Sequence, residues 1–310
     1  MLTSRHREEL EEKGYTVVEG VLTEGECDQY RQQYLDWIRD NFHEGVFPAT
    51  KRSLVRATYK MGHLAPTWDI RLKCKHVFAQ LWGTDRLLTS FDSVAIGRPP
   101  EEGVEAFRSQ DTSWLHIDQL AVGGLQVFQG AVYLEHADED DWTFQVLKGS
   151  HKLFETFWKD HPEERERSVE KGEGSTKFTP DLVNWWISKG CQSCCVPVPK
   201  GGLVLWDSRT VHANDNPLKG RAHPERWRWV VIVSMWPVGM VDERGLAIRQ
   251  QAYSNIVQTC HDLRVKDPED LEIPPKHPLT ELPEIAKTLE AKRLAGMEPY
   301  PPGKKMESQL

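Results

Sequence analysis

The chain has 310 residues, and its 39 basic and 47 acidic side chains give a formal net charge of −8. This balance argues against nucleic acid or an anionic membrane as the main partner, because both need a basic surface. No apolar run approaches the roughly 20 residues of a membrane-spanning helix. The charged N-terminal stretch MLTSRHREELEEKGY lacks the apolar core of a signal peptide. We therefore expect a cytoplasmic protein.

The first part of the chain, residues 1–86, is predicted to be mostly helical. A helix that ends at Gly14 is followed by the β-branched run YTVVEGVL and then by a helix capped by Thr23. Residues 65–82 predict a further helix.

From residue 87 to residue 240 the pattern changes to short strands separated by Gly, Pro and Asp turns. The predicted strands lie in LLTSFDSVAIG, WLHIDQ, LQVFQGAVYLEHA, TFQVLKGS, CCVPVP, GLVLWDS and RWRWVVIVSMW. Such runs predict a mainly β fold, a sandwich or barrel of two sheets with flanking helices. A polar insertion at about 154–189 is too long for a plain hairpin, so it is either a lid or a peripheral helix. Residues 241–310 predict a helix and then a Pro-rich tail, and we expect the whole chain to form a single domain.

The six cysteines are few for this length and irregularly spaced, which is typical of a reducing compartment. Three of them form the group CQSCC at 191–195, which resembles half of a zinc site. A structural zinc needs a second Cys or His pair, and the other three cysteines are isolated. We therefore interpret the group as reduced thiols beside a strand.

The strand WLHIDQ places a histidine and an aspartate two residues apart. Successive strand side chains point to opposite faces, so His116 and Asp118 share a face, and Trp114 joins them. A buried carboxylate is tolerated mainly when it is paired or binds a metal. The pair therefore indicates either a cation site or a solvated surface.

A third ligand is available in GGLVLWDSRTVHAND, where His212 follows an apolar strand. Two histidines and a carboxylate with open positions are the facial triad of non-haem Fe(II) oxygenases. The open positions would take a chelating cosubstrate and O2. The alternative for His212 is a polar residue at the end of a strand.

Two arginines lie in the otherwise apolar strand HPERWRWVVIVSMWP. A buried guanidinium needs a carboxylate, and arginine is suited to binding one through two hydrogen bonds. Counting the alternation places Arg228 on the face of Val230 and Ile232, with Arg226 on the same face nearer the mouth. An α-keto diacid that chelates iron at one end would meet such an arginine at the other. The alternative is that one or both side chains reach solvent at the end of the sheet.

Several motifs then occur in one characteristic order. They are LEEKGYTVVEGVLTEGECDQYR near the N-terminus, HID at 116–118, VLKGSHK at 146–152, GGLVLWDSRTVH at 201–212 and the arginine strand. This ordered set, which spans roughly residues 8–240, resembles the phytanoyl-CoA dioxygenase family of Fe(II)/2-oxoglutarate oxygenases. The resemblance implies a double-stranded β-helix barrel of the jelly-roll or cupin type. It also implies Fe(II), the cosubstrate 2-oxoglutarate and O2.

The resemblance also implies roles for individual residues. Those that match the family's iron ligands are His116, Asp118 and His212, and Arg228 best matches the arginine that binds the distal carboxylate of 2-oxoglutarate. The loop that leads to this arginine is longer than is usual in the family, which leaves Arg226 and Arg221 open as the binder.

Three further residues lie near these motifs. In some members of the family a tryptophan lines the cosubstrate site, and its position corresponds to about residues 130–131, which are Gly and Ala here. The neighbouring Gln129 is a candidate for a polar role at that place. Trp114 is a candidate aromatic wall of the same site, and such walls suit an apolar or planar small molecule; the alternative is that this tryptophan is simply a core residue. His151 matches a turn histidine of the family, and we expect it to be structural.

The resemblance implies an enzyme that couples oxidative decarboxylation of 2-oxoglutarate, to succinate and CO2, to oxidation of a small-molecule substrate. Halogenating relatives replace the carboxylate ligand with a small residue, so Asp118 favours hydroxylation, desaturation or ring formation. Hydroxylation is the reaction that we expect. The alternative function is a catalytically silent barrel that binds a ligand or a partner, although silent relatives usually lose a ligand or the arginine.

Overall fold

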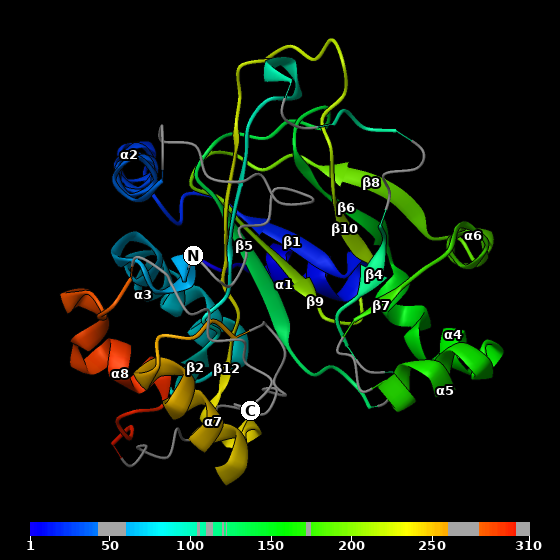
Figure 1. Cartoon of the computed structure of the whole chain (residues 1–310). Coiled ribbons are helices and arrows are strands. Elements are labelled where there is room, and N and C mark those ends of the chain that lie inside the picture. The colour runs from blue at the N-terminus through cyan, green and yellow to red at the C-terminus, as the bar shows by residue number, and fades with distance from the viewer. Residues whose placement is uncertain are drawn as a thin grey trace.

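The computed structural model describes residues 1–42, 60–103, 106–109, 114–119, 121, 123–171, 175–259 and 279–301. Two five-stranded antiparallel sheets form the centre of the fold (Figure 1). The first sheet has the order β1 (Tyr15–Val18), β9 (Leu203–Asp207), β5 (Phe128–Tyr133), β11 (Arg228–Ile232) and β3 (Val94–Gly97). The second sheet has the order β7 (Thr176–Lys177), β4 (His116–Ile117), β10 (His212–Asp215), β6 (Thr143–Lys148) and β8 (Gln192–Val196). A separate pair is formed by β12 (Met235–Pro237) and β2 (Leu87–Thr89).

The inner faces of the two sheets form one buried cluster. Tyr133 and Trp206 from the first sheet pack there with Phe144 and Val146 from the second. Because strand side chains alternate, every second residue of these strands faces the space between the sheets. This alternation decides which polar side chains enter the interior.

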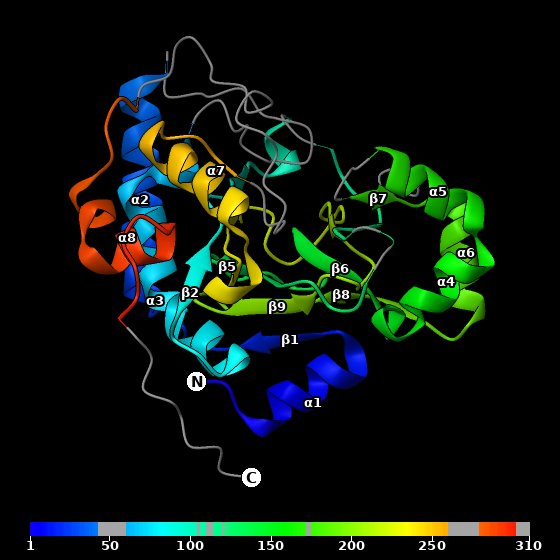
Figure 2. The ribbon, with the colours of Figure 1, turned by 90° about the horizontal axis from the view of Figure 1, so that it is seen from below.

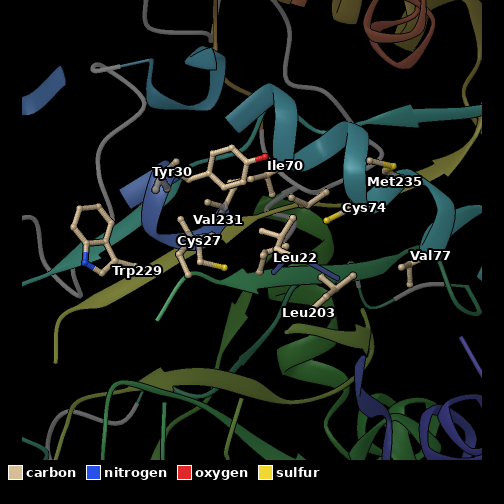
Figure 3. Close-up of a cluster of buried hydrophobic side chains, with 14 of the residues drawn as sticks. Leu22, Cys27, Tyr30, Ile70, Cys74, Val77, Leu203, Trp229, Val231 and Met235 are labelled. Carbon is tan, nitrogen blue, oxygen red and sulfur yellow. The ribbon is translucent and has the colours of Figure 1, made fainter. Parts of the chain in front are cut away.

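The outer face of the first sheet is covered by α2 (Glu24–Asn41) and α3 (Ala65–Trp82). Figure 3 shows the cluster of buried hydrophobic side chains that these helices and the sheet form together. Thr23 caps α2 as predicted, through a hydrogen bond that its side chain accepts from the backbone of Glu26. The helix α3 approaches β5 closely at Gly130. A Cβ added there would lie 2.8 Å from the Val233 carbonyl oxygen and 3.1 Å from the Phe78 ring, so this position requires glycine.

The outer face of the second sheet is covered by the insertion, which forms α4 (Phe154–Asp160), α5 (Pro162–Lys171) and α6 (Pro180–Ser188). Its aromatic side chains form a buried cluster with Ile117, Leu147 and Ala213 of the second sheet. Trp186 is fully buried and stacks on Phe157, with 4.6 Å between ring centroids. The sequence left a lid and a peripheral helix as alternatives for this insertion, and packing on the outside of the sheet is that of peripheral helices.

The remaining helices also agree with the sequence pattern. The first helix, α1 (Ser4–Lys13), ends at Gly14, whose φ of 85° is in the left-handed region that favours glycine. The C-terminal region contributes α7 (Glu243–Ser254) and α8 (Leu289–Ala295), and Figure 2 shows α8 on the opposite side of the molecule from α4–α6. Short 3₁₀ helices lie at Met61–His63, Pro100–Glu102, Ser150–Leu153, Val238–Met240 and Glu284–Lys287. Most of the predicted Pro-rich tail, from residue 302, lies outside the described residues.

The strand pattern differs from the prediction in several places. The run RWRWVVIVSMW forms two strands, β11 and β12, in different sheets, and the insertion contributes β7 to the second sheet. The run LLTSFDSVAIG forms two strands, β2 and β3, that belong to different sheets. Between them the backbone leaves the ladder, and the Phe91 amide donates instead to the Thr259 hydroxyl. The polar residues HAND at 212–215 form β10, where only the end of a strand was expected. Each helix that the structure describes is too short or too polar to span a lipid bilayer.

Candidate metal centre

Two neighbouring strands of the second sheet bring the three predicted ligands together. His116 opens β4, Asp118 follows that strand directly, and His212 opens β10. The register pairs His116 with His212 across the two strands. One ligand atom from each of the three side chains lies within 4.8 Å of the other two. The exposed fractions are 5%, 6% and 3%, so the group is shielded from solvent.

The two imidazoles present their Nε2 atoms to the carboxylate. His116 Nε2 lies 3.3 Å from Asp118 Oδ1, and His212 Nε2 lies 3.3 Å from Asp118 Oδ2. The Nδ1 atoms lie 3.0 Å and 2.9 Å from the carbonyl oxygens of Trp114 and Thr210. Because a carbonyl only accepts, each Nδ1 carries the proton and each Nε2 keeps a lone pair. Burial and the neighbouring His116 lower the pKa of His212, which favours the neutral imidazole that a metal needs.

These side chains fit a divalent transition metal. Two neutral imidazole nitrogens and one carboxylate are the donor set of the facial triad. Their shared tautomer is set by backbone carbonyls, as is usual for histidines that bind metal. A solvated surface, which was the alternative for His116 and Asp118, is excluded by their burial.

Trp114 lies against His116, the first of the candidate ligands. Its indole stacks on the His116 imidazole, with 4.4 Å between centroids and 11° between planes, and its Nε1 donates to the Asn214 carbonyl at 2.8 Å. The structure therefore places Trp114 as a support that links β4 to β10. Strand alternation predicts that Trp114 shares a face with His116, and the stacking agrees with this; its role as a wall of the cosubstrate site stays a prediction.

Two glutamines surround Asp118. Gln129, on β5 of the first sheet, donates from Nε2 to Asp118 Oδ2 at 3.1 Å. Gln119 is fully buried and holds the loop after Asp118, since it donates to the Gly124 carbonyl and accepts from the Ser208 hydroxyl at 2.7 Å. Sequence reasoning missed Gln119. Its position directly after HID was the available signal, but its partners are distant in sequence.

The three candidate arginines occupy different places. Arg228 opens β11, is 3% exposed and shares the inner face of the first sheet with Val230. Burial raises the pKa of the Tyr133 phenol to about 12, and the nearby positive charge of Arg228 acts in the opposite direction. Arg226 instead pairs with Asp138 at 2.6 Å and Asp141 at 3.0 Å. Arg221 pairs with Glu101 and Asp141.

Aromatic rings close the inner side of the centre. The Trp206 ring lies 5.1 Å from the His212 imidazole and the Phe144 ring lies 5.7 Å from it. Trp229, by contrast, belongs to the outer cluster under α2 and α3. His151 lies outside the ligand group, and its Nε2 is 2.9 Å from the Glu11 carbonyl oxygen.

Comparison with known proteins agrees with this site. Residues 10–216, more than half of the chain, match the family model of phytanoyl-CoA dioxygenase (PhyH). The chain therefore belongs to the phytanoyl-CoA dioxygenase family. This membership, together with the candidate metal site, indicates that its general class is that of an oxygenase.

A curated relative is "Ava biosynthesis cluster protein O" of Aspergillus versicolor, which is 26% identical over 272 residues, 82% of this chain and 84% of that protein. Among solved structures, GlcNAc Inducible Gene 2, GIG2 (DUF1479), from Candida albicans is 14% identical with a TM-score of 0.65, over 98% of this chain and 78% of that one. AviO1 from Streptomyces viridochromogenes Tue57 is 17% identical with a TM-score of 0.50, over 77% and 98%. At these identities the two structures show a common fold of antiparallel sheets with flanking helices.

Proposed function

We propose that the chain is an Fe(II)/2-oxoglutarate-dependent dioxygenase that hydroxylates a small molecule and releases succinate and CO2. The observation that carries the proposal is the buried convergence of His116 Nε2, His212 Nε2 and the Asp118 carboxylate, in a member of this oxygenase family. The buried Arg228 on the facing sheet supports the keto-acid part of the proposal.

The residues of the chain have separate tasks in this reaction. His116, Asp118 and His212 would hold the iron, and Arg228 would pair with the distal carboxylate of 2-oxoglutarate. The iron, when bound with 2-oxoglutarate, supplies the chemistry that activates O2. The backbone carbonyls behind both imidazoles keep the Nε2 lone pairs directed at the centre. Trp206 and Phe144 exclude water from its inner side, which favours oxidation of the substrate over side reactions.

The strand order supports the finer description of the fold. In the double-stranded β-helix that we propose, the chain alternates between the two sheets through β3, β4, β5 and β6. It stays in the second sheet from β6 to β8 and then alternates again through β9, β10 and β11. The cysteines among the described residues are free thiols, which supports a reducing compartment such as the cytoplasm.

Titration calorimetry with Mn(II), with and without 2-oxoglutarate, tests the proposal. An Fe(II)/2-oxoglutarate enzyme should bind one Mn(II) and should bind 2-oxoglutarate much more tightly once the metal is present. Metal binding without that coupling would indicate a metalloenzyme that does not use the keto acid. Absence of metal binding would favour the catalytically silent barrel.

A further inference from the structure

Gln129 is fully buried on β5 and faces the second sheet. Its Nε2 donates to Asp118 Oδ2, while its Oε1 has no hydrogen-bond partner among the residues that the structure describes. A buried amide with one unsatisfied end is unfavourable for folding. Fold stability alone therefore gives no reason for a glutamine at this position.

The chemistry of Asp118 decides which way the amide points. An ionised carboxylate only accepts hydrogen bonds, so the NH2 end of the Gln129 amide must face it. Turning the amide over would place two acceptor oxygens against each other. The single polar contact of Gln129 among the described residues is thus directed at a candidate metal ligand.

The two oxygens of this carboxylate consequently differ. Each oxygen lies 3.3 Å from a histidine Nε2, Oδ1 from that of His116 and Oδ2 from that of His212, but Oδ2 in addition accepts the hydrogen bond from Gln129. An octahedral ion bound by two imidazoles and one carboxylate oxygen keeps about three positions open, enough for a chelating keto acid and O2 together. If both carboxylate oxygens bound the ion, one of those positions would be lost. An oxygen that already accepts a hydrogen bond is less available as a second ligand atom.

We infer that Gln129 is a positioning residue that restricts Asp118 to one ligating oxygen and so keeps a metal position open. The inference rests on the proposed function, since it assumes that the centre holds a metal. It also makes the polar role expected from the sequence more specific, because the Gln129 amide contacts the candidate metal ligand Asp118.

The test uses Mn(II) alone as the probe, on the full chain. Gln129→Met removes both ends of the amide at nearly constant volume, and Gln129→Asn keeps the amide but shortens the side chain by one methylene. Both variants should bind Mn(II) roughly tenfold more weakly, because the carboxylate is no longer held in place. Solvent-proton relaxation per bound Mn(II) scales with the number of coordinated waters. It should fall by about a third, as two open positions replace three.

Gln145→Met is the matched control, because Gln145 lies on β6 and donates to the Ser193 hydroxyl, away from the ligand group. It should keep both the wild-type affinity and the wild-type relaxation. If Gln129→Met relaxes solvent protons as the wild type does per bound ion, the inference is wrong while the proposed function stands. A wild-type chain that binds no Mn(II) overturns the proposed function, and the inference with it.

Discussion

The two sheets of this protein have the same number of strands but different tasks. Each strand of the first sheet has at least four residues, and its outer face packs on α2 and α3. In the second sheet, β4 and β7 have only two residues each, yet this sheet carries His116 and His212. The comparison indicates that long buried strands provide stability, while a short ladder between β4 and β10 of the opposite sheet positions the candidate ligands.

The largest expected effect is the loss of metal from the second sheet. His116→Ala or His212→Ala removes one of the three ligands and should abolish both iron retention and turnover. Metal content after dialysis, measured together with succinate release, checks this. His76→Ala is the control, because His76 is exposed on α3 of the other layer. Retention of one iron per chain by either ligand variant would contradict the site assignment.

The insertion that covers the second sheet should behave as scaffold. Trp186 is fully buried against Phe157, so Trp186→Ala should lower the free energy of unfolding by about 3–5 kcal/mol. Urea unfolding of the metal-free protein measures the change. The neighbouring Trp185→Ala should cost less, because Trp185 is only partly buried. A Trp186 variant with unchanged stability and an altered KM would favour the lid instead.

The contribution of the first sheet to the site should appear in 2-oxoglutarate binding. Arg228→Ala removes a charge-assisted pair worth about 1.5–3 kcal/mol, so the 2-oxoglutarate Kd should rise by roughly ten- to a hundredfold. Mn(II) binding should be unchanged, because Arg228 is not a ligand. Arg226→Ala should leave the Kd near its wild-type value, since Arg226 pairs with Asp138 and Asp141. The reverse result would identify Arg226 as the binder.

The smallest effect concerns the helices on the first sheet. Lys73 of α3 pairs with Glu26 of α2 at 2.8 Å, and this bond and the Thr23 cap lower the pKa of Glu26 from 4.5 to about 2. A lowered carboxyl pKa stabilises the fold above the unfolded value of 4.5 and loses this effect as the pH falls toward 2. Because the Glu26 side chain is 31% exposed and that of Lys73 is 36% exposed, solvent screens the pair, and Glu26→Gln should cost less than about 1 kcal/mol at neutral pH. The difference in Tm between Glu26→Gln and the wild type should vanish as the pH approaches the folded-state pKa of about 2. A difference that stays constant with pH would contradict the link between the Glu26 pKa and stability.

The sequence by itself determined the features that depend on local chemistry. Thr23 and Gly14 mark helix ends because caps and left-handed glycines act within a few residues. Alternation placed Arg228 on the face of Val230 because the period of a strand is fixed by its backbone. The ordered motifs identified the family, and with it the three residues that converge in the structure.

Only the tertiary structure decided the features that depend on distant partners. The polar run at 212–215 is a strand because β6 and β4 supply its hydrogen bonds, and no local pattern contains that information. Gln129 lies on the sheet opposite to Asp118, so its contact with the carboxylate exists only once the two sheets face each other. The insertion is peripheral because its aromatic side chains find an apolar face outside the second sheet. In each case the free energy comes from long-range pairing or burial, which residues close together in sequence do not specify.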